Sequence, residues 1–395
     1  MKSDPENPTT DPDNRPPTSE VTEAFDQAFM RQALRLALKA VGRTHPNPLV
    51  GALVVRDGRI IGRGWHRGVG TDHAETMALA AAGEAARGAT IYVTLEPCAH
   101  FVGLNGQPRL PCAERCVRAG VARVVCAIAD PDVRVNGNGF AHLRAAGIEV
   151  SVGTEEAAAR TLNLPFLRHR TLGLPFILHK AAMTLDGKIA APDGSARWIT
   201  GGRSRRYVHR LRNRVDAIVV GIGTILTDDP SLTVRLPSGN GRDPLRVIMD
   251  SRLRTPVGAR VVRPGTLFLT TEETDSPKGR RLVEAGAEVR TVPADDNGRV
   301  DVVRAMELVA ARGCLAVLLE SGGELAAAFH RAKLINRVIY FIAPKLIGGA
   351  GPTPIDGTGL AAGMAEAFVT GSLRVRRFGE DIAITADVGD IVYRK

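Results

Sequence analysis

The stretch TIYVTLEPCAH, residues 90–100, runs from a strand-like segment into a Pro-Cys pair. It follows HAE, residues 73–75, which opens an Ala-rich helical segment, and it precedes a second cysteine, Cys112. One imidazole and two thiolates form a three-ligand set that leaves open the fourth position of a catalytic zinc. The sequence therefore predicts a zinc site made of His73, Cys98 and Cys112, on a framework in which strands and helices alternate.

Glu75 lies two residues after His73, close enough to reach the water on the metal without ligating it. From there it can take a proton from that water and pass it to a leaving amine. The order H-x-E…P-C…C is the signature of zinc deaminases, although their cysteines are normally spaced C-x-x-C. Because thirteen residues separate Cys98 from Cys112, Cys116 remains an alternative third ligand.

The alternation of strands and helices extends over the whole chain and predicts two α/β domains joined near residue 170. We expect strands at 49–56, 90–96, 123–128 and 148–152 in the first block, and at 176–183, 215–220, 245–250, 266–270, 314–320 and 337–343 in the second. Helices are expected at 24–41, 73–86, 277–286 and 301–312, a linker at 164–175 and an exposed loop at 236–244.

The composition of the 395 residues excludes collagen, coiled coils and wholly disordered chains, since 44% are hydrophobic and 24% charged. No apolar run is long enough to span a membrane, and no signal peptide opens the chain, so we expect a cytoplasmic protein. Residues 1–22 begin with a proline-rich polar stretch and are expected to form a disordered tail. The net charge of +10 indicates either anionic partners or a biased genomic composition.

The second block contains arginines and glycines whose pattern is compatible with anion binding and equally with an ordinary tight turn and a solvated helix face. GIGTIL, residues 221–226, follows a strand but lacks the third glycine of a dinucleotide-binding fingerprint. Four arginines form a polar helical stripe, namely Arg203, Arg206, Arg210 and Arg214. Arg212 instead faces the apolar side and needs an anionic partner, which is either an internal carboxylate or a substrate phosphate or carbonyl.

Ordered motifs from about residue 24 to 390 resemble one family. They are HPNPLVGALVV (45–55), HAE (73–75), TLEPCAH (94–100), PC (111–112), AGVARVV (119–125), DPDVRVNGNG (130–139), KAAMTLDGKIA (180–190), RWIT (197–200), DDPSLTVR (228–235), ESGG (320–323) and IAPKLIGG (342–349). The family is the bifunctional riboflavin-biosynthesis diaminohydroxyphosphoribosylaminopyrimidine deaminase / 5-amino-6-(5-phosphoribosylamino)uracil reductase. Relative to its usual PCSHHGRTPPC, this chain has a longer segment between the two cysteines.

The resemblance implies a cytidine-deaminase-like α/β/α domain at 23–168 and a dihydrofolate-reductase-like α/β domain at 172–395. It implies one zinc per chain on His73, Cys98 and Cys112, with Glu75 catalytic, and NADPH in the second domain. By motif position, the cofactor contacts are Ala182, Trp198, Thr224, Asp228, Ser251, Gly322 and Gly323. The substrate contacts are Asn47, Ala196, Arg212, Leu232, Arg235 and Glu320, and Lys180 is a further candidate to handle a proton or a phosphate.

The activity implied is hydrolytic deamination of 2,5-diamino-6-ribosylamino-4(3H)-pyrimidinone 5′-phosphate, followed by reduction of its ribosyl group to a ribityl chain. The expected partner is this phosphorylated ribosylamino-pyrimidine, with no nucleic acid and no membrane, in a possible homo-oligomer. A nucleic-acid deaminase is the main alternative, but it leaves the second domain unexplained and has few aromatic residues for stacking on bases. A non-catalytic nucleotide-binding regulator is the other alternative.

Overall fold

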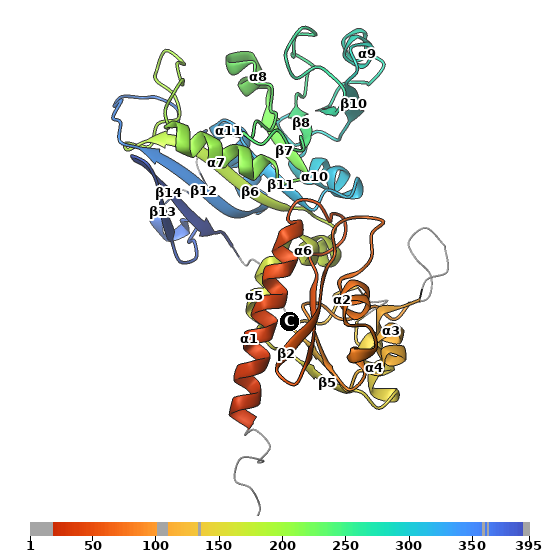
Figure 1. Ribbon diagram of the computed structural model, residues 1–395. Helices are drawn as coiled ribbons and strands as arrows, with labels where there is room; N and C mark the ends of the chain where they lie inside the picture. Colours follow the sequence, from red (N-terminus) through yellow and green to blue (C-terminus); the bar gives the residue numbers. More distant parts are fainter. Residues whose placement is uncertain (1–18, 101–109, 133–135, 358–359, 362, 390–395) are drawn as a thin grey trace, which may run out of the picture. The chain divides into compact units, whose positions relative to one another are not determined.

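The computed structural model describes residues 19–100, 110–132, 136–357, 360–361 and 363–389. The chain divides into two units, of which unit 1 comprises Met1–Ala40 and Leu49–Leu162 and unit 2 comprises Val41–Pro48 and Asn163–Lys395. Each unit is built around its own sheet (Figure 1). This confirms the expected α/β class.

Unit 1 is a sheet of five strands, within the described residues, in the order β2-β1-β3-β4-β5. The hairpin of β1 and β2 turns at Asp57-Gly58, and β3, β4 and β5 run parallel to one another. The elements are α1 Ser19–Ala37, η2 Leu38–Ala40, β1 Gly51–Arg56, β2 Arg59–Trp65, α2 Ala74–Ala82, η3 Gly83–Ala86, β3 Thr90–Val93, α3 Cys112–Ala119, β4 Arg123–Cys126, α4 Asn138–Ala145, β5 Glu149–Val152 and α5 Glu156–Leu162.

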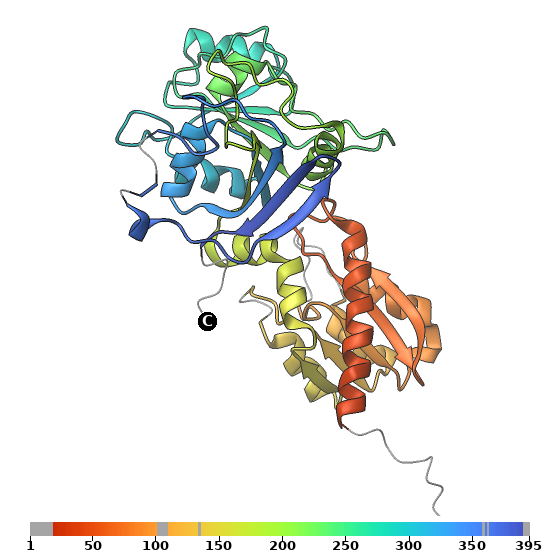
Figure 2. The same ribbon diagram turned by 90° about the vertical axis from the view of Figure 1, so that its left-hand side faces the viewer.

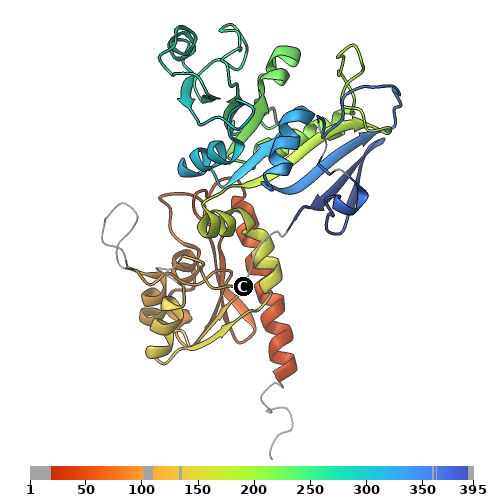
Figure 3. The same ribbon diagram turned by 180° about the vertical axis from the view of Figure 1, so that it is seen from behind.

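Helices cover both faces of this sheet (Figure 3). Side chains on one face of β1, β3 and β4 form a buried cluster with α2, α3 and α4, whereas α1 packs against the other face. Tyr92 of β3 marks the α1 side, where its hydroxyl donates to Asp26 at 2.7 Å and its ring lies 5.2 Å from that of Phe29. The two helical layers confirm the cytidine-deaminase-like α/β/α arrangement.

Glycines in the first hairpin allow helices to approach the sheet closely. A Cβ atom added at Gly51 would lie 2.0 Å from the carbonyl oxygen of Ala33 in α1. On the opposite face, a Cβ at Gly64 would lie 2.0 Å from the carbonyl oxygen of Ala74 in α2. Both distances are far below van der Waals contact, so these positions require glycine because of packing.

Unit 2 is a sheet of nine strands, within the described residues, in the order β10-β9-β8-β7-β11-β6-β12-β14-β13. All neighbours are parallel from β10 to β12, and β14 and β13 add an antiparallel edge. The elements are α6 Leu164–Leu172, β6 Phe176–Thr184, α7 Gly202–Arg212, β7 Ala217–Gly221, α8 Ile222–Asp228, β8 Leu245–Met249, β9 Thr266–Thr270, α9 Pro277–Glu284, β10 Glu288–Thr291, α10 Val302–Ala311, β11 Ala316–Leu319, α11 Gly323–Arg331, β12 Ile335–Ala343, η4 Met364–Glu366, β13 Arg374–Phe378 and β14 Asp381–Asp387.

The central strands of unit 2 are apolar on both faces because helices bury both faces (Figure 2). Met306 and Val309 of α10 pack with Phe329 of α11 on one side. Leu282 of α9 and Ile225 of α8 pack on the other. Strands such as AIVVG and AVLL therefore lack the alternation of a half-exposed strand.

Val41–Pro48 lies between η2 and β1 in the chain but packs as part of unit 2. The Arg43 guanidinium donates to the carbonyl oxygen of Asn213 at 3.2 Å, and Nδ1 of His45 lies 2.5 Å from Oδ2 of Asp216. Asp216 is buried, and burial would raise its pKa, but the bond to His45 and those from backbone N–H groups lower it below its usual value. These two contacts hold Val41–Pro48 in place within unit 2.

Several boundaries differ from the sequence prediction. Helix α1 begins at Ser19, so residues 19–22 of the expected tail are helical, which the chain permits since its last early proline is Pro17. The expected linker at 164–175 is mostly helix α6, and it belongs to unit 2. Residues 1–18 of the tail lie outside the described residues. In the described part of the chain, no helix combines the length and apolarity that crossing a bilayer demands.

We expect Gly51→Ala to lower the free energy of unfolding of unit 1 by about 3 kcal/mol, because the new methyl group collides with backbone rather than with a side chain that can move. Calorimetric unfolding of the full chain measures the effect. Gly258→Ala is the control, since a Cβ there meets open space. Equal stability of the two variants would contradict the close-packing explanation.

Candidate active sites

His73, Cys98 and Cys112 lie together in unit 1, with their ligand atoms all within 4.8 Å of one another. Nδ1 of His73 is 3.8 Å from Sγ of Cys98 and 3.2 Å from Sγ of Cys112. A tetrahedral zinc with ordinary Zn–N and Zn–S bonds separates nitrogen and sulfur ligands by about 3.6 Å. The donor set therefore fits zinc in both chemistry and spacing.

Local structure positions each of these side chains. His73 is the N-cap of α2, Cys98 follows β3 at its carboxyl end, and Cys112 is the first residue of α3. The backbone N–H of Cys112 donates to Sγ of Cys98 at 3.4 Å. A helix start presents free N–H groups and a partial positive charge, which favours thiolate over thiol.

The pKa values of the Cys98 and Cys112 thiols are shifted in opposite directions. Hydrogen bonding with Cys112, together with His73, lowers the pKa of Cys98 to about 3. The same bond, together with burial and the charge of Glu75, raises the pKa of Cys112. A cation at this point would favour the deprotonated form of both.

Glu75 lies in the first turn of α2 and is 3% exposed. Burial raises the pKa of its carboxyl group above the usual value, while the charge of His73 acts in the opposite direction. A carboxyl group with a raised pKa beside a metal site can both accept and return a proton.

Cys116 is placed in the core. It lies one helical turn beyond Cys112, and its side chain packs in the apolar cluster of unit 1 with Phe140 and Leu143. Burial raises the pKa of its thiol well above the ordinary value. Cys126, in β4, belongs to the same cluster. Residues 101–109, which contain most of the lengthened segment, lie outside the described residues.

Glu96 organises the loop beside His73, Cys98 and Cys112, a role that the sequence motifs did not indicate. Its buried carboxylate accepts hydrogen bonds from the backbone N–H groups of Asp130, Gly137 and Gly139 at 3.2, 3.0 and 2.9 Å. It comes two residues before Cys98, so the loop is tied to the strand end that carries this ligand. The sequence feature that could have indicated this role is the position of Glu96, an acidic residue between a buried strand and a proline.

Asn47 belongs to the segment that packs with unit 2, where its backbone N–H donates to the carbonyl oxygen of Thr44 at 2.8 Å. Its expected contact with the pyrimidine therefore stays a prediction.

In unit 2, a buried carboxylate joins two cations. Nε and Nη2 of Arg212 donate to the two oxygens of Glu320 at 2.8 and 3.1 Å, and Nζ of Lys180 donates at 3.2 Å. Of the two partners considered for Arg212, the structure shows the internal carboxylate. Burial alone would raise the pKa of Glu320, but attraction to Arg212 and Lys180 outweighs it and lowers the pKa to about 2.

This carboxylate lines a cavity of about 660 Å³ that contains most of the predicted reductase contacts. The arginine stripe is solvent-exposed as expected, whereas Arg212 reaches inward. The predicted substrate contacts on the wall are Ala196, Arg212, Leu232, Arg235 and Glu320, and the predicted cofactor contacts are Ala182, Trp198, Thr224, Asp228, Gly322 and Gly323. Ser251 instead lines a second cavity of about 570 Å³, on which Thr224 and both glycines also border.

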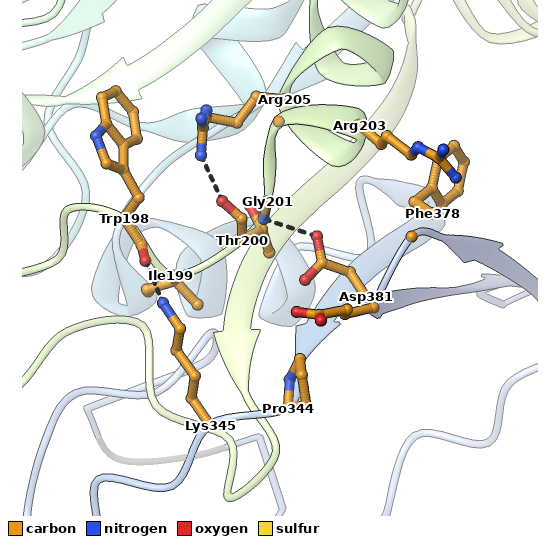
Figure 4. A pocket seen from close by; sticks show the side chains of 13 residues that line it. Trp198, Ile199, Thr200, Gly201, Arg203, Arg205, Pro344, Lys345, Phe378 and Asp381 are labelled. Carbon is orange, nitrogen blue, oxygen red and sulfur yellow. Dashed lines mark hydrogen bonds between the residues drawn. The ribbon is translucent and has the colours of Figure 1, made fainter.

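Trp198 is 62% exposed, so it is not a core residue. Its carbonyl oxygen accepts a hydrogen bond from Nζ of Lys345 at 2.6 Å, and the guanidinium of Arg205 lies 4.5 Å from the ring centroid (Figure 4). Arg205 also donates to the carbonyl oxygen of Thr200 at 2.6 Å. Two cations thus hold the RWIT segment from either side, with the indole ring at the mouth of the larger cavity.

Asp381 of β14 caps the N-terminus of α7 in a neighbouring hollow of about 460 Å³ (Figure 4). Its carboxylate accepts from the backbone N–H of Gly201 at 2.8 Å and from the hydroxyl of Ser204 at 2.5 Å. These two bonds tie the start of α7 to β14.

Two family models match the chain. The RibD C-terminal domain matches residues 175–384, and the cytidine and deoxycytidylate deaminase zinc-binding region matches residues 23–128. Each match falls on one of the two sheets.

Full-length relatives match both parts together. The riboflavin biosynthesis protein RibD of Aquifex aeolicus is 39% identical over 91% of this chain and 98% of its own, and that of Escherichia coli is 39% identical over 82% and 89%. Among solved structures, Acinetobacter baumannii RibD matches with a TM-score of 0.83 at 34% identity, covering 93% of this chain and all of that one. The diaminohydroxyphosphoribosylaminopyrimidine deaminase/5-amino-6-(5-phosphoribosylamino)uracil reductase of Thermotoga maritima matches with a TM-score of 0.79 at 32% identity, with the same coverage.

The ligand geometry predicts how cysteine substitutions affect metal content. Cys112→Ala should lose bound zinc, because two of the three protein donors remain. Cys116→Ala is the matched control one helical turn away and should keep its zinc, because its thiol is packed in the apolar cluster. Zinc per chain, measured by atomic emission after gel filtration, gives the comparison. The reverse pattern would show that Cys116 is the ligand.

The buried carboxylate predicts an acid dependence of stability. Because the folded-state pKa of Glu320 lies below its unfolded value, its stabilising contribution is present above about pH 5 and is lost as pH falls toward 2, on the order of 3 kcal/mol. Denaturant unfolding between these pH values should show this loss in the wild type and a smaller one in Glu320→Gln. Glu307→Gln removes an exposed carboxylate and should follow the wild type. Identical slopes for wild type and Glu320→Gln would refute the assignment.

Proposed function

The chain belongs to the RibD family of bifunctional deaminase/reductase enzymes of riboflavin biosynthesis, and on that premise we propose how its own residues divide the work. One zinc per chain is held by His73, Cys98 and Cys112 in a deaminase domain spanning about residues 23–168. The observation that carries this assignment is the convergence of one imidazole and two cysteine sulfurs within 4.8 Å, beside a buried glutamate.

When bound, zinc supplies Lewis-acid chemistry that lowers the pKa of water and so makes a nucleophile at neutral pH. Glu75 accepts the proton that water loses as it attacks the amino-bearing ring carbon of the pyrimidine. It then returns this proton to the departing amine, which leaves as ammonia. The raised pKa of the buried carboxyl group supports this role, since a proton shuttle works best when its pKa is near the working pH.

The substrate is 2,5-diamino-6-ribosylamino-4(3H)-pyrimidinone 5′-phosphate, and Asn47 contacts its pyrimidine ring. The deaminated product then enters the reductase domain, about residues 172–395. There the substrate contacts are Ala196, Arg212, Leu232, Arg235 and Glu320. The single exposed arginine among them, Arg235, suits the phosphate.

NADPH supplies the hydride for the second reaction, at C1′ of the ribosyl group. Ala182 and Trp198 line the same cavity as the substrate contacts, which would bring the nicotinamide and the ribose together there. Thr224, Gly322 and Gly323 border both cavities, so the middle of the dinucleotide would lie against these three residues. Asp228 and Ser251 are the remaining proposed contacts of the cofactor.

Lys180 provides the proton that this reduction needs. As C1′ gains a hydride, its bond to the ring oxygen breaks, and that oxygen must gain a proton to become a hydroxyl group of the ribityl chain. Nζ of Lys180 reaches the cavity and is held there by Glu320 at 3.2 Å. Glu320 in turn is fixed by Arg212, which keeps the ammonium group in one place.

We place the enzyme in the cytoplasm, where a reducing environment keeps cysteine thiols available for zinc.

Glu75→Gln should reduce ammonia release from the diamino substrate by a factor on the order of 10²–10⁴, because the amide cannot carry the proton. Zinc content should be unchanged, and reduction of the separately supplied deaminated product with NADPH should proceed at the wild-type rate. Ammonia assays and absorbance at the nicotinamide band give both rates on one preparation. Simultaneous loss of both activities would contradict two separate sites.

A further inference from the structure

The RWIT segment, residues 197–200, lies between two hollows of unit 2. Trp198, Ile199 and Thr200 line both the cavity of about 660 Å³ and the neighbouring hollow of about 460 Å³ (Figure 4). Of these two spaces, only the larger one is also lined by Ala182, the other proposed contact near the nicotinamide. A group that holds Trp198 from the side of the hollow therefore also shapes the cavity of the proposed reduction.

Lys345 holds the backbone of this segment from the hollow. Its Nζ donates to the carbonyl oxygen of Trp198 at 2.6 Å, and it lines the hollow but not the larger cavity. The backbone of Lys345 is itself fixed on both sides. Its N–H donates to the carbonyl oxygen of Ala343 in β12, and its carbonyl oxygen accepts from the N–H of Leu185, which follows β6, both at 2.8 Å. Lys345 thus influences the larger cavity through Trp198, without touching a ligand there.

Arg205 holds the ring of Trp198. Its guanidinium lies 4.5 Å from the indole centroid, within the range of cation–π attraction, and Nη1 donates to the carbonyl oxygen of Thr200 at 2.6 Å (Figure 4). Arg205 comes from the start of α7, which Asp381 ties to β14. The two cations reach the segment from different elements, so the backbone and the ring of Trp198 are each held separately.

Neither cation is paired with a carboxylate among the described residues, although Asp381 lines the same hollow. The carboxylate of Asp381 accepts from Gly201 and Ser204 instead. The hydrogen bonds of Arg205 and Lys345 go to carbonyl oxygens of the RWIT segment. Because the Trp198 side chain is 62% exposed, without such restraints it would change rotamer on the picosecond-to-nanosecond timescale of surface side chains.

We propose that Lys345 and Arg205 are positioning residues of the reductase, which hold the indole of Trp198 as a fixed wall for the nicotinamide ring of NADPH. This inference rests on the proposed function, which puts the nicotinamide in the larger cavity. A wall that is already ordered lowers the entropy lost when the cofactor binds. It also keeps the hydride donor in one orientation relative to the ribose.

Tryptophan fluorescence tests the restraint without cofactor. The chain has two tryptophans, so Trp65→Phe leaves Trp198 as the single emitter. In that background, Arg205→Leu should enlarge the fast, nanosecond component of the anisotropy decay, because the ring loses the cation beside it. Arg206→Leu is the matched control, since Arg206 is exposed on the same helix and lines neither space. Equal mobility of the indole in the two variants would contradict the inference.

Steady-state kinetics of the zinc-loaded full chain tests the consequence for the cofactor. Arg205→Leu and Lys345→Met should each raise KM for NADPH about fivefold, which matches the strength of a partly exposed cation–π or hydrogen-bond contact. The KM for the deaminated pyrimidine and kcat at saturating NADPH should stay within about twofold of the wild type. Lys345→Arg keeps a donor and should recover most of the NADPH affinity. Lys278→Met, at an exposed lysine of α9 outside both spaces, is the control.

A double-mutant cycle separates positioning from direct contact, because Arg205 also lines the larger cavity. In a Trp198→Ala background, Arg205→Leu should change KM for NADPH less than twofold. A further fivefold rise there would show that Arg205 itself touches the ligand and would overturn the positioning role. Wild-type KM values for NADPH in both single variants would overturn the inference while the NADPH-dependent reductase stands. A wild type that does not oxidise NADPH with the deaminated product would refute the proposed reductase, and the inference with it.

Discussion

Both candidate sites depend on the direction in which parallel strands run. Strands β3 and β4 in unit 1, and β7, β8 and β11 in unit 2, end at a common edge of their sheets. Beyond such an edge the backbone no longer has ladder partners, so loops and helix starts must satisfy it. Cys98 follows β3, and Glu320 follows β11, each at the point where the regular hydrogen bonding stops. Reactive side chains lie at this edge because the sheet ends there, which leaves space for side chains and backbone N–H groups without ladder partners.

The arginine excess of this chain is divided between structural and binding roles. Arg212 is paired with buried Glu320, and in unit 1 Arg123 pairs with buried Asp26 and exposed Glu149, so both cations already have carboxylate partners. The cations that remain for ligands are few and local, which is why a net charge of +10 gives a poor description of what the protein binds.

The local sequence pattern was sufficient to predict the α/β class, most of the strands and the grouping of His73 with Cys98 and Cys112. It failed where the deciding contact is distant in sequence. The partner of Arg212 is 108 residues away, and helical periodicity shows only that a partner is required. The choice between Cys112 and Cys116 depends on which side of α3 faces the core, and spacing alone leaves this open. Strand β13 was missed because RVRRF is mostly exposed and lacks an apolar face.

The hydrogen bond between His45 and Asp216 also bears on how the protein is made. His45 leaves the ribosome 171 residues before Asp216, so Val41–Pro48 can reach this partner only after the elements beside it in the chain, η2 and β1, have been synthesised. Folding of this segment must therefore wait for later synthesis, and neither unit corresponds to one uninterrupted piece of polypeptide. An exchange of halves between related genes, cut at the boundary near residue 162, would separate the buried Asp216 from its hydrogen-bond partner His45. Both parts of the gene must therefore come from compatible parents if Asp216 is to keep its partner in Val41–Pro48.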